Sequence, residues 1–291
     1  MKVSCFTFLR NVHMLGYPFV ESIKSALPLC DEFIVNVGNG EDDTLEMVRS
    51  IRDPRIRIIQ SSWNEKMRTK GCVFGQQTNI AHFNCTGDWA FYLQADEVIH
   101  EDDIPKITAA MEKYLDDDRV EALVFDFIHF YGNHKTYVWN PHWYRRVPRI
   151  IKTSVSSHSP GDGLVFVVLE SNKKGRYPRA ALTNAKIYHY GWVRSELQWN
   201  EKMKKLSKYW GNIPIQNNFD YSQIDQMSLR EFKGTHPAVM EGWLPKGVAS
   251  VFEADSNYVL SKKDIRYRIE LMIEKMLGVD LSKKYCKIIR K

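Results

Sequence analysis

The sequence predicts an α/β fold with a mostly parallel central sheet, flanking helices and helical appendages at the C-terminus. Short apolar runs that are typical of buried strands alternate with amphipathic helical stretches over the first hundred residues. The run 89–93 is aromatic and apolar throughout, which is typical of a strand buried on both faces. Asp96 and Glu97 follow it, so carboxylates emerge at the carboxyl end of a strand, where α/β proteins bind their ligands.

The N-terminal elements form a predicted βαβ unit. Residues 3–9 make an apolar strand, and a helix with Pro18 in its first turn leads to a second strand over 33–37. The loop after this strand opens a further helix, in which Asp43 and Glu46 have the spacing of a capping box.

The same periodicities continue along the chain. They predict strands over 55–60, 121–130 and 186–192, and helices over 74–83 and 104–115.

The C-terminal part carries two more predicted helices, which we expect to be appendages on a single core. One begins after Ser195, and the other begins after Ser261 and ends at Gly278. The last helix has an apolar stripe that we expect to face the interior; it consists of Ile265, Ile269, Met272 and Met276.

Length and composition agree with one globular domain that carries additions. The chain has 291 residues, of which 44% are apolar and 26% charged, close to the average of soluble domains. No run reaches the length of a membrane span, no signal peptide is recognised, and the five scattered cysteines lack CxxC spacing. We therefore expect a cytoplasmic protein with reduced thiols. The net charge of +6 accompanies no nucleic-acid-binding motif, so no nucleic acid partner is expected.

Several side chains are candidates for chemistry. Asp96 offers a hard oxygen ligand that suits a divalent cation shared with a nucleotide diphosphate, although an exposed acidic turn has the same composition. Asp126 stands amid apolar residues and is either a hydrogen-bonded structural group or a site residue. Asp162 lies in a turn with Gly161 and Gly163, which either connects a hairpin or lets the backbone approach a ligand. Three aromatic side chains have flat faces that either stack on sugar rings or fill the core: Trp139, Trp143 and Tyr144.

The first hundred residues resemble the nucleotide-binding half of bacterial-type family 2 glycosyltransferases, which share the glycosyltransferase A fold. The resemblance rests on the first strand, the acidic, glycine-containing loop 36–44, Gly71 with 77–79, and the segment 87–97. This last segment is similar to the family's Asp-x-Asp metal motif, although Gln94 replaces its first aspartate. Asn36 likewise stands where the family usually has an aspartate.

The resemblance implies a metal-dependent, inverting transfer of a sugar from a nucleotide diphosphate sugar, with a UDP-sugar favoured. The acceptor would be a hydroxyl of a glycan or lipid-linked molecule in surface polysaccharide assembly. Asp96 and His189 would hold Mn²⁺ or Mg²⁺, and Asp162, or Asp126 as second choice, would be the catalytic base. His189 could equally be a core histidine. The nucleotide-sugar pocket would comprise Phe8, Arg10, Asn36, Gly38, Asp42, Asn79 and Gln94.

In this interpretation the chain has three parts. Residues 1–100 are the nucleotide-sugar-binding half, 101–194 are the acceptor and catalytic half of the same domain, and 195–291 are a helical C-terminal extension.

Two other functions remain open. A sugar-phosphate nucleotidyltransferase could use a similar sheet, but it normally has a glycine-rich basic loop after the first strand, which residues 9–11 lack. A non-catalytic glycan- or anion-binding module is compatible with the missing acids at Asn36 and Gln94.

The tail 281–291 alternates basic with apolar residues. This composition predicts peripheral contact with an anionic membrane, at the inner membrane face, where lipid-linked acceptors reside. The alternative is a basic end that packs its isoleucines on the core.

Overall fold

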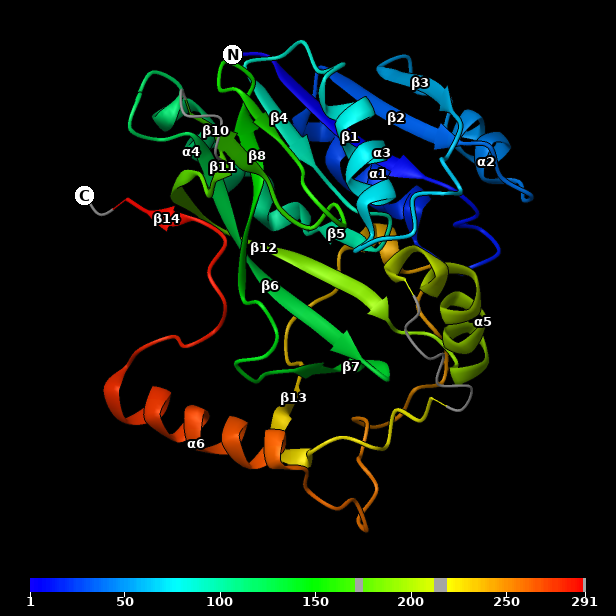
Figure 1. The fold of residues 1–291 in the computed structure, drawn as a ribbon, viewed down its shortest axis with the longest axis vertical. Helices are drawn as coiled ribbons and strands as arrows, with labels where there is room; N and C mark the ends of the chain where they lie inside the picture. Colours follow the sequence, from blue (N-terminus) through cyan, green and yellow to red (C-terminus); the bar gives the residue numbers. More distant parts are fainter. Residues whose placement is uncertain (171–174, 212–218, 290–291) are drawn as a thin grey trace.

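The computed structural model describes residues 1–170, 175–211 and 219–289 and is built around one large mixed sheet (Figure 1). Four parallel strands form its first half, in the order β4 (Trp89–Tyr92), β1 (Val3–Leu9), β2 (Glu32–Gly38) and β3 (Ile56–Ser61). The first three of these are buried over nearly their whole length, because helices or loops cover both of their faces.

Antiparallel strands form much of the second half. β8 (Arg146–Lys152) pairs with β4 and with β6 (Ala122–Tyr131) and so joins the two halves. β7 (Asn133–Val138) pairs antiparallel with the C-terminal end of β6, and β13 (Leu229–Glu231) pairs antiparallel with β7.

The long strand β12 (Arg179–Trp192) runs parallel to β6 on its other edge. The short β5 (Glu97–Ile99) pairs antiparallel with β12 and brings His189 opposite Glu97. Strand pairing therefore holds the segment after β4 against the strand that carries His189.

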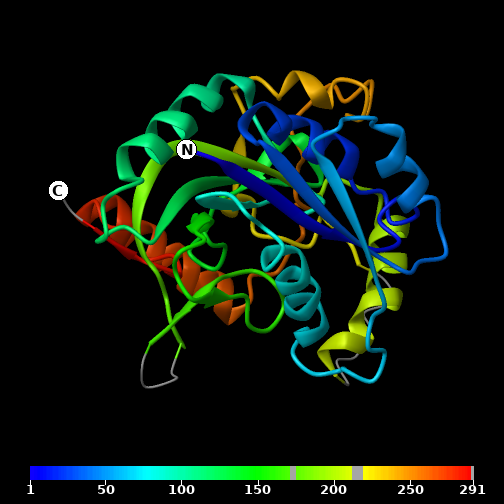
Figure 2. The ribbon, with the colours of Figure 1, turned by 90° about the horizontal axis from the view of Figure 1, so that it is seen from above.

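Helices cover both faces of the sheet. Figure 2 shows α1 (Phe19–Ala26) and α4 (Ile104–Tyr114) on one side and α3 (Cys72–His82) on the other. Successive side chains of β1 point to opposite faces of the sheet, which matches this arrangement. Cys5 packs in the core under α1, and Phe6 packs in the core under α3. The predicted fold class is confirmed.

The remaining elements are short. They are α2 (Thr44–Ser50), a small sheet of β9 (Ser157–His158), β10 (Val167–Leu169) and β11 (Gly175–Arg176), and the 3₁₀ turns η1 (Leu27–Leu29), η2 (Glu101–Asp103), η3 (Ser207–Trp210), η4 (Gln226–Ser228) and η5 (Ala238–Met240).

Helix caps were predicted with mixed success. Ser195 and Ser261 form complete capping boxes for α5 (Glu196–Leu206) and α6 (Lys262–Leu277). The box expected at Asp43 is wrong, because the Asp43 side chain makes no cap hydrogen bond to α2. Asp42 accepts a hydrogen bond from the Thr44 backbone N–H instead, at 3.1 Å.

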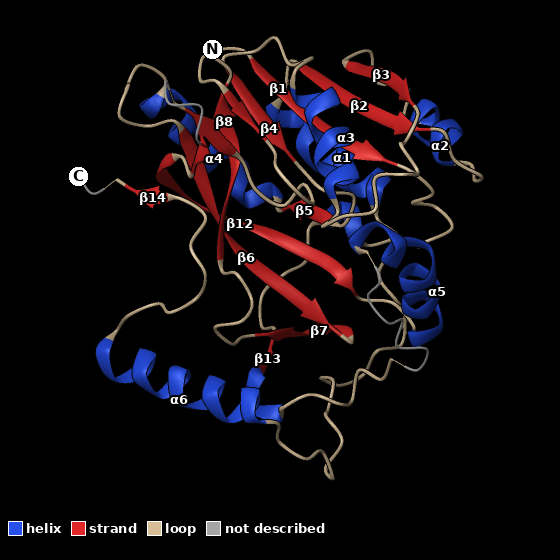
Figure 3. Cartoon of the chain, viewed as in Figure 1, coloured by secondary structure: helices blue, strands red, loops and turns tan. Residues whose placement is uncertain are grey.

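The expectation that α6 turns its apolar stripe inward is also wrong. Figure 3 shows α6 at the edge of the molecule, and its four stripe residues are 49% to 78% exposed. The helix is anchored through polar side chains instead: Glu274 is buried against Arg145 with two hydrogen bonds of 2.9 Å, and Arg268 pairs with Asp225. Periodicity reveals an amphipathic stripe but not which side meets the protein.

The tail returns to the sheet. β14 (Lys287–Ile288) pairs with the start of β12, Ile289 packs against the core, and Tyr285 is buried. The alternative of a tail packed on the core is therefore observed for Tyr285 and Ile289, whereas Ile288 is exposed. Arg290 and Lys291 lie outside the described residues. Within the ranges that the structure describes, no helix is long and apolar enough to cross a bilayer.

Candidate active site

A cavity of about 390 Å³ opens at the carboxyl ends of β1 and β4. Phe8 and Arg10 reach it from the end of β1, Gln94 and Asp96 from the turn after β4, Asp162 from the loop after β9, and His189 from β12. Six predicted site residues from four parts of the chain therefore line one cavity, at the edge of the sheet where α/β proteins bind ligands.

Asp96 and His189 face one another in this cavity. The Asp96 Oδ2 atom lies 3.6 Å from His189 Nε2, and both side chains are about nine-tenths buried. Burial alone would raise the pKa of Asp96, but His189 and the cations Lys202 and Arg194 outweigh it and hold that pKa well below its usual range. Asp96 is therefore an anion at neutral pH.

Gly191 leaves the space beside these two donors open. A Cβ atom at this position would lie 2.6 Å from Asp96 Oδ2 and 2.7 Å from His189 Nε2. A carboxylate oxygen and an imidazole nitrogen suit Mn²⁺, and the oxygen also suits Mg²⁺. Throughout the described ranges, no group of three or more His, Cys, Asp or Glu side chains gathers as a metal site. The residues present thus fit a cation that takes its other ligands from water or a bound diphosphate.

Glu97, the neighbour of Asp96, has a structural position. It forms a fully buried bidentate salt bridge with Arg149, with N···O distances of 2.6 and 2.8 Å, and accepts a hydrogen bond from the Gln94 backbone N–H. Arg149 also donates to the carbonyl oxygen of Leu164 at 2.7 Å. This pair ties the turn that carries Asp96 to the loop that carries Asp162.

The loop around Asp162 is held against α3. Asn79 donates to the carbonyl oxygen of Ser159 at 2.9 Å and accepts from the Ser159 N–H at 2.7 Å. The Gly75 N–H donates to the carbonyl of Gly161 at 3.0 Å. Asn79, expected in the nucleotide pocket, therefore positions the loop, while Asp162 itself is exposed at the cavity.

Four other predicted residues do not line this cavity. Asn36 is fully buried and donates to the backbone and side-chain oxygens of Gln77. Gly38 and Asp42 line a separate cavity of about 360 Å³ next to β2. Asp126 lies in a different groove, where its Oδ1 accepts a hydrogen bond of 2.7 Å from Arg146, because its strand turns this side chain toward α6.

Aromatic side chains that the sequence did not single out form one wall. Trp63 and Trp210 both pack on Phe74, with ring centroids 5.3 and 4.8 Å apart, and all three line the cavity. Trp143 and Tyr144, predicted as flat surfaces, line it as well, whereas Trp139 lies in the other groove under Arg145. A local sequence pattern cannot find this wall, because its members come from a loop, a helix and a 3₁₀ turn that are far apart in the chain.

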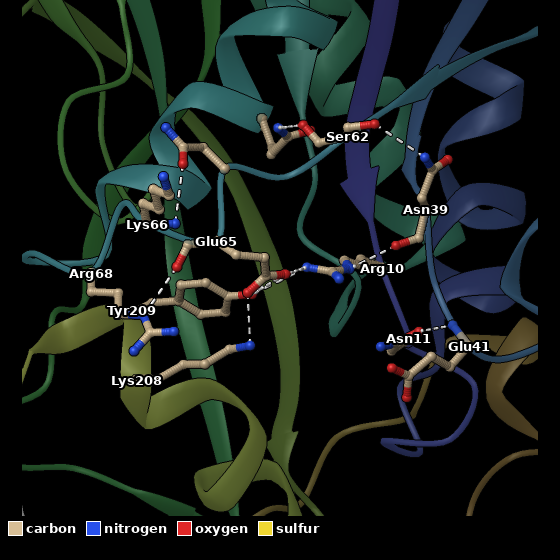
Figure 4. Close-up of polar contacts among 12 residues, drawn as sticks. Arg10, Asn11, Asn39, Glu41, Ser62, Glu65, Lys66, Arg68, Lys208 and Tyr209 are labelled. Atoms are coloured by element: carbon tan, nitrogen blue, oxygen red, sulfur yellow. Dashed lines mark hydrogen bonds and ion pairs between the residues drawn. The ribbon is translucent and has the colours of Figure 1, made fainter.

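Arg10, which lines the cavity, belongs to a network of charged side chains (Figure 4). Arg10 Nη1 lies 2.5 Å from one carboxylate oxygen of Glu65, and Lys208 Nζ lies 2.7 Å from the other. Partial burial would raise the pKa of Glu65, but its bonds to Lys208, Arg10 and the Tyr209 hydroxyl lower it to about 2. This network joins the end of β1 to the turn η3 that follows α5, and Lys202 of α5 lines the cavity beside it.

Residues 17–169, just over half of the chain, match the family model described as Glycosyl transferase family 2. A comparison with curated proteins finds no match.

Among solved structures, similar chains include S. aureus TarS 1–349 in complex with UDP-GlcNAc, with 18% identity and a TM-score of 0.34 over 46% of this chain and 36% of that one. Glucosyl-3-phosphoglycerate synthase from Mycobacterium tuberculosis, with Mg²⁺ and UDP, has 14% identity and a TM-score of 0.32 over 43% of each chain. Mannosyltransferase PcManGT from Pyrobaculum calidifontis, with GDP-Man and Mn²⁺, has 20% identity and a TM-score of 0.33 over 44% of this chain and 36% of that one. This chain therefore covers less than half the length of each of these three.

Proposed function

The chain belongs to glycosyl transferase family 2, a family of sugar-transferring enzymes, and on this premise we propose that it transfers a sugar from a nucleotide diphosphate sugar to an acceptor hydroxyl. The donor is a UDP-sugar, the acceptor is a glycan or lipid-linked molecule of surface polysaccharide assembly, and the transfer inverts the anomeric configuration. The observation that carries this proposal is the single cavity in which Asp96, His189 and Asp162 meet an aromatic wall and a set of cations.

The donor diphosphate lies beside Asp96 and His189 in this proposal. These two residues would hold Mn²⁺ or Mg²⁺, which would supply positive charge against the charge that grows on the leaving diphosphate. Lys202 and Arg10 add positive charge to the lining of the cavity. Arg10 is already paired with Glu65, so Lys202 is the stronger electrostatic contributor.

The aromatic residues would bind the flat parts of the donor and acceptor. Phe8 and Trp63, whose ring centroids are 6.0 Å apart, are positioned for the nucleoside, and Trp143 and Tyr144 for a sugar ring. Asn36 and Asn79 support this pocket from behind through their bonds to Gln77 and Ser159. Residues 1–100 thus supply the donor half and 101–194 the acceptor half.

Asp162 acts as the general base. Its Oδ1 accepts a hydrogen bond of 3.2 Å from the Leu164 N–H, which orients the carboxylate within a loop that Asn79 and Arg149 hold in place. The carboxylate takes the proton of the acceptor hydroxyl as the oxygen attacks the anomeric carbon from the face opposite the diphosphate.

We expect Asp162→Asn to lower the turnover number about 10²- to 10⁴-fold and to leave donor affinity almost unchanged, because a general base acts only when the acceptor attacks. Release of free nucleotide diphosphate from UDP- and GDP-sugars in the presence of Mn²⁺ measures this. Asp126→Asn is the comparison, since Asp126 lies in another groove with Arg146. If Asp126→Asn loses turnover and Asp162→Asn does not, Asp126 is the catalytic base instead.

The same assay separates the proposed function from the two alternatives. A sugar-phosphate nucleotidyltransferase releases pyrophosphate instead of nucleotide diphosphate. A glycan- or anion-binding module releases neither product, although it could still bind the donor.

We also propose that the protein works at the cytoplasmic face of an anionic membrane. The apolar side chains of α6 point away from the core, and the basic residues Lys262, Lys263 and Arg266 begin the same helix. The tail contributes the positive charges of Lys283 and Lys287, but its Tyr285 and Ile289 pack against the core and cannot contact a membrane. Apolar contact would therefore come from α6 and electrostatic attraction from both segments.

Vesicle flotation tests this contact. Each Lys near an anionic surface contributes about 1 kcal/mol, so Lys283→Glu with Lys287→Glu should weaken binding to phosphatidylserine vesicles at low salt by more than tenfold. Charge reversal keeps the β14 pairing and the buried Tyr285, which a truncation after Asp280 would remove. Equal binding by the variant and the wild type would exclude the tail from membrane contact.

A further inference from the structure

A second buried histidine stands directly behind His189. His129 of β6 is the register partner of His189 on β12 and is 2% exposed. The Nδ1 atoms of the two rings are 3.0 Å apart, and the Nε2 atom of His129 lies 2.7 Å from the carbonyl oxygen of Tyr144. Phe127 stacks on the His129 ring, and the Tyr144 ring meets it edge-on.

These contacts determine where the ring hydrogens are. A backbone carbonyl can only accept, so the Nε2 atom of His129 carries a hydrogen. The ring is buried, and among the described residues its ring nitrogens bond only to His189 and the Tyr144 carbonyl. A buried charge without an anionic partner is costly, so the ring is neutral and its Nδ1 atom is a bare acceptor. The hydrogen between the two Nδ1 atoms therefore belongs to His189.

This assignment fixes the tautomer of His189. With its hydrogen on Nδ1, the neutral imidazole has a bare Nε2, and Nε2 is the atom that lies 3.6 Å from Asp96 in the cavity. A metal ligand needs such a lone pair. Without an acceptor behind it, a neutral imidazole can place its hydrogen on either nitrogen, and the form with Nε2–H cannot ligate from that side.

We propose that His129 is a positioning residue, which holds His189 in the Nδ1–H tautomer and so presents the Nε2 lone pair to a divalent cation beside Asp96. The relay runs from the Tyr144 carbonyl through His129 to His189. The metal-binding role of His189 rests on the proposed function. The tautomer of His189 does not, because it is a property of the metal-free protein.

Two nearly isosteric variants test the relay. In His129→Asn the side-chain Oδ1 can take the place of Nδ1 and accept from His189, whereas His129→Leu has the same size and no acceptor. Both variants lose the bond to Tyr144, so a difference between them reports only the acceptor for His189.

The first readout is long-range ¹H–¹⁵N NMR of the metal-free protein at mildly alkaline pH. We expect a protonated Nδ1 and a bare Nε2 for His189 in the wild type and in His129→Asn, and a mixture of tautomers in His129→Leu. The second readout is Mn²⁺ binding, followed by electron paramagnetic resonance without donor. Loss of an outer partner of a metal-bound histidine weakens binding about 10- to 100-fold, and we expect this loss in His129→Leu only.

A wild-type His189 with its hydrogen on Nε2 would overturn the proposal, and so would equal weakening of Mn²⁺ binding in both variants. Failure of the wild type to bind Mn²⁺ would overturn the cation role. If the tautomers and Mn²⁺ affinities are as expected but no nucleotide sugar is turned over, the proposed function fails while the role of His129 stands.

Discussion

The Asp96→Asn variant is expected to lose at least about 10³-fold in turnover, since a charge that stabilises the leaving diphosphate through a cation is worth several kcal/mol and each 1.36 kcal/mol is tenfold in rate. The Asn side chain has the same shape, but it is a poor cation ligand and leaves Lys202 and Arg194 without their anion. Release of nucleotide diphosphate measures the effect. Turnover near the wild-type level would exclude Asp96 from the reaction.

The fold of this variant should be kept, although it becomes less stable. Because the pKa of Asp96 is lowered in the folded state, its ionised form stabilises the protein above the unfolded pKa of about 3.9. That contribution is lost as the pH falls from there toward the lower folded pKa, and Asn lacks it at every pH. Asp88→Asn is the matched control, since Asp88 lies exposed at the other end of β4, hydrogen-bonded to the Lys2 N–H. It should turn over like the wild type.

The Glu97→Gln variant is expected to lose about 3–5 kcal/mol of unfolding free energy, because it leaves Arg149 as an uncompensated buried charge. Both side chains of this pair have 0% exposure, so water cannot replace the lost carboxylate. Urea denaturation at neutral pH gives the change directly.

The control for this prediction is Glu170→Gln. Glu170 pairs with Arg176 at the surface, where the two side chains are 47% and 33% exposed, and such pairs are worth at most about 1 kcal/mol. A similar small change in Glu97→Gln would mean that the buried pair does not hold the turn after β4. Replacing both partners, as in Glu97→Leu with Arg149→Met, should restore part of the stability, since no charge is then left alone.

The strands at the centre of the sheet could be predicted because their apolar runs are continuous. Nearly all side chains of the segments 3–9 and 89–93 are buried. A continuous apolar run is typical of a strand that is covered on both faces, so local composition was enough to predict these two strands. The position of Asp96 followed from this, since a side chain just after such a strand must lie at the carboxyl edge of the sheet.

The partners of Asp96 could not be predicted from local patterns. His189 reaches it only because β5 pairs antiparallel with β12, and Lys202 only because α5 packs over the cavity. The resemblance to the family suggested His189, but His129 became visible only through the register of β6 with β12.

Polar groups within strands were the hardest to interpret. Asn36 looked like a nucleotide contact and is held by Gln77 in the core, and Asp126 looked buried but reaches Arg146 in another groove. In both cases the decisive partner comes from an element that sequence spacing does not reveal. The stripe of α6 was assigned inward for a similar reason, because the anchors Arg145 and Asp225 are distant in sequence.

The central claim is that the cavity beside Asp96 binds a nucleotide sugar together with a divalent cation. Thermal unfolding with UDP-sugars, with and without Mn²⁺, tests it most directly, because ligand at a hundred times its dissociation constant adds about 2.7 kcal/mol to the stability of the folded protein. We predict a stabilisation of the wild type by a UDP-sugar that grows with Mn²⁺, and loss of the Mn²⁺-dependent part in Asp96→Asn. An Mn²⁺-dependent stabilisation of Asp96→Asn equal to that of the wild type would contradict the account. A wild type that no nucleotide sugar stabilises would contradict it as well.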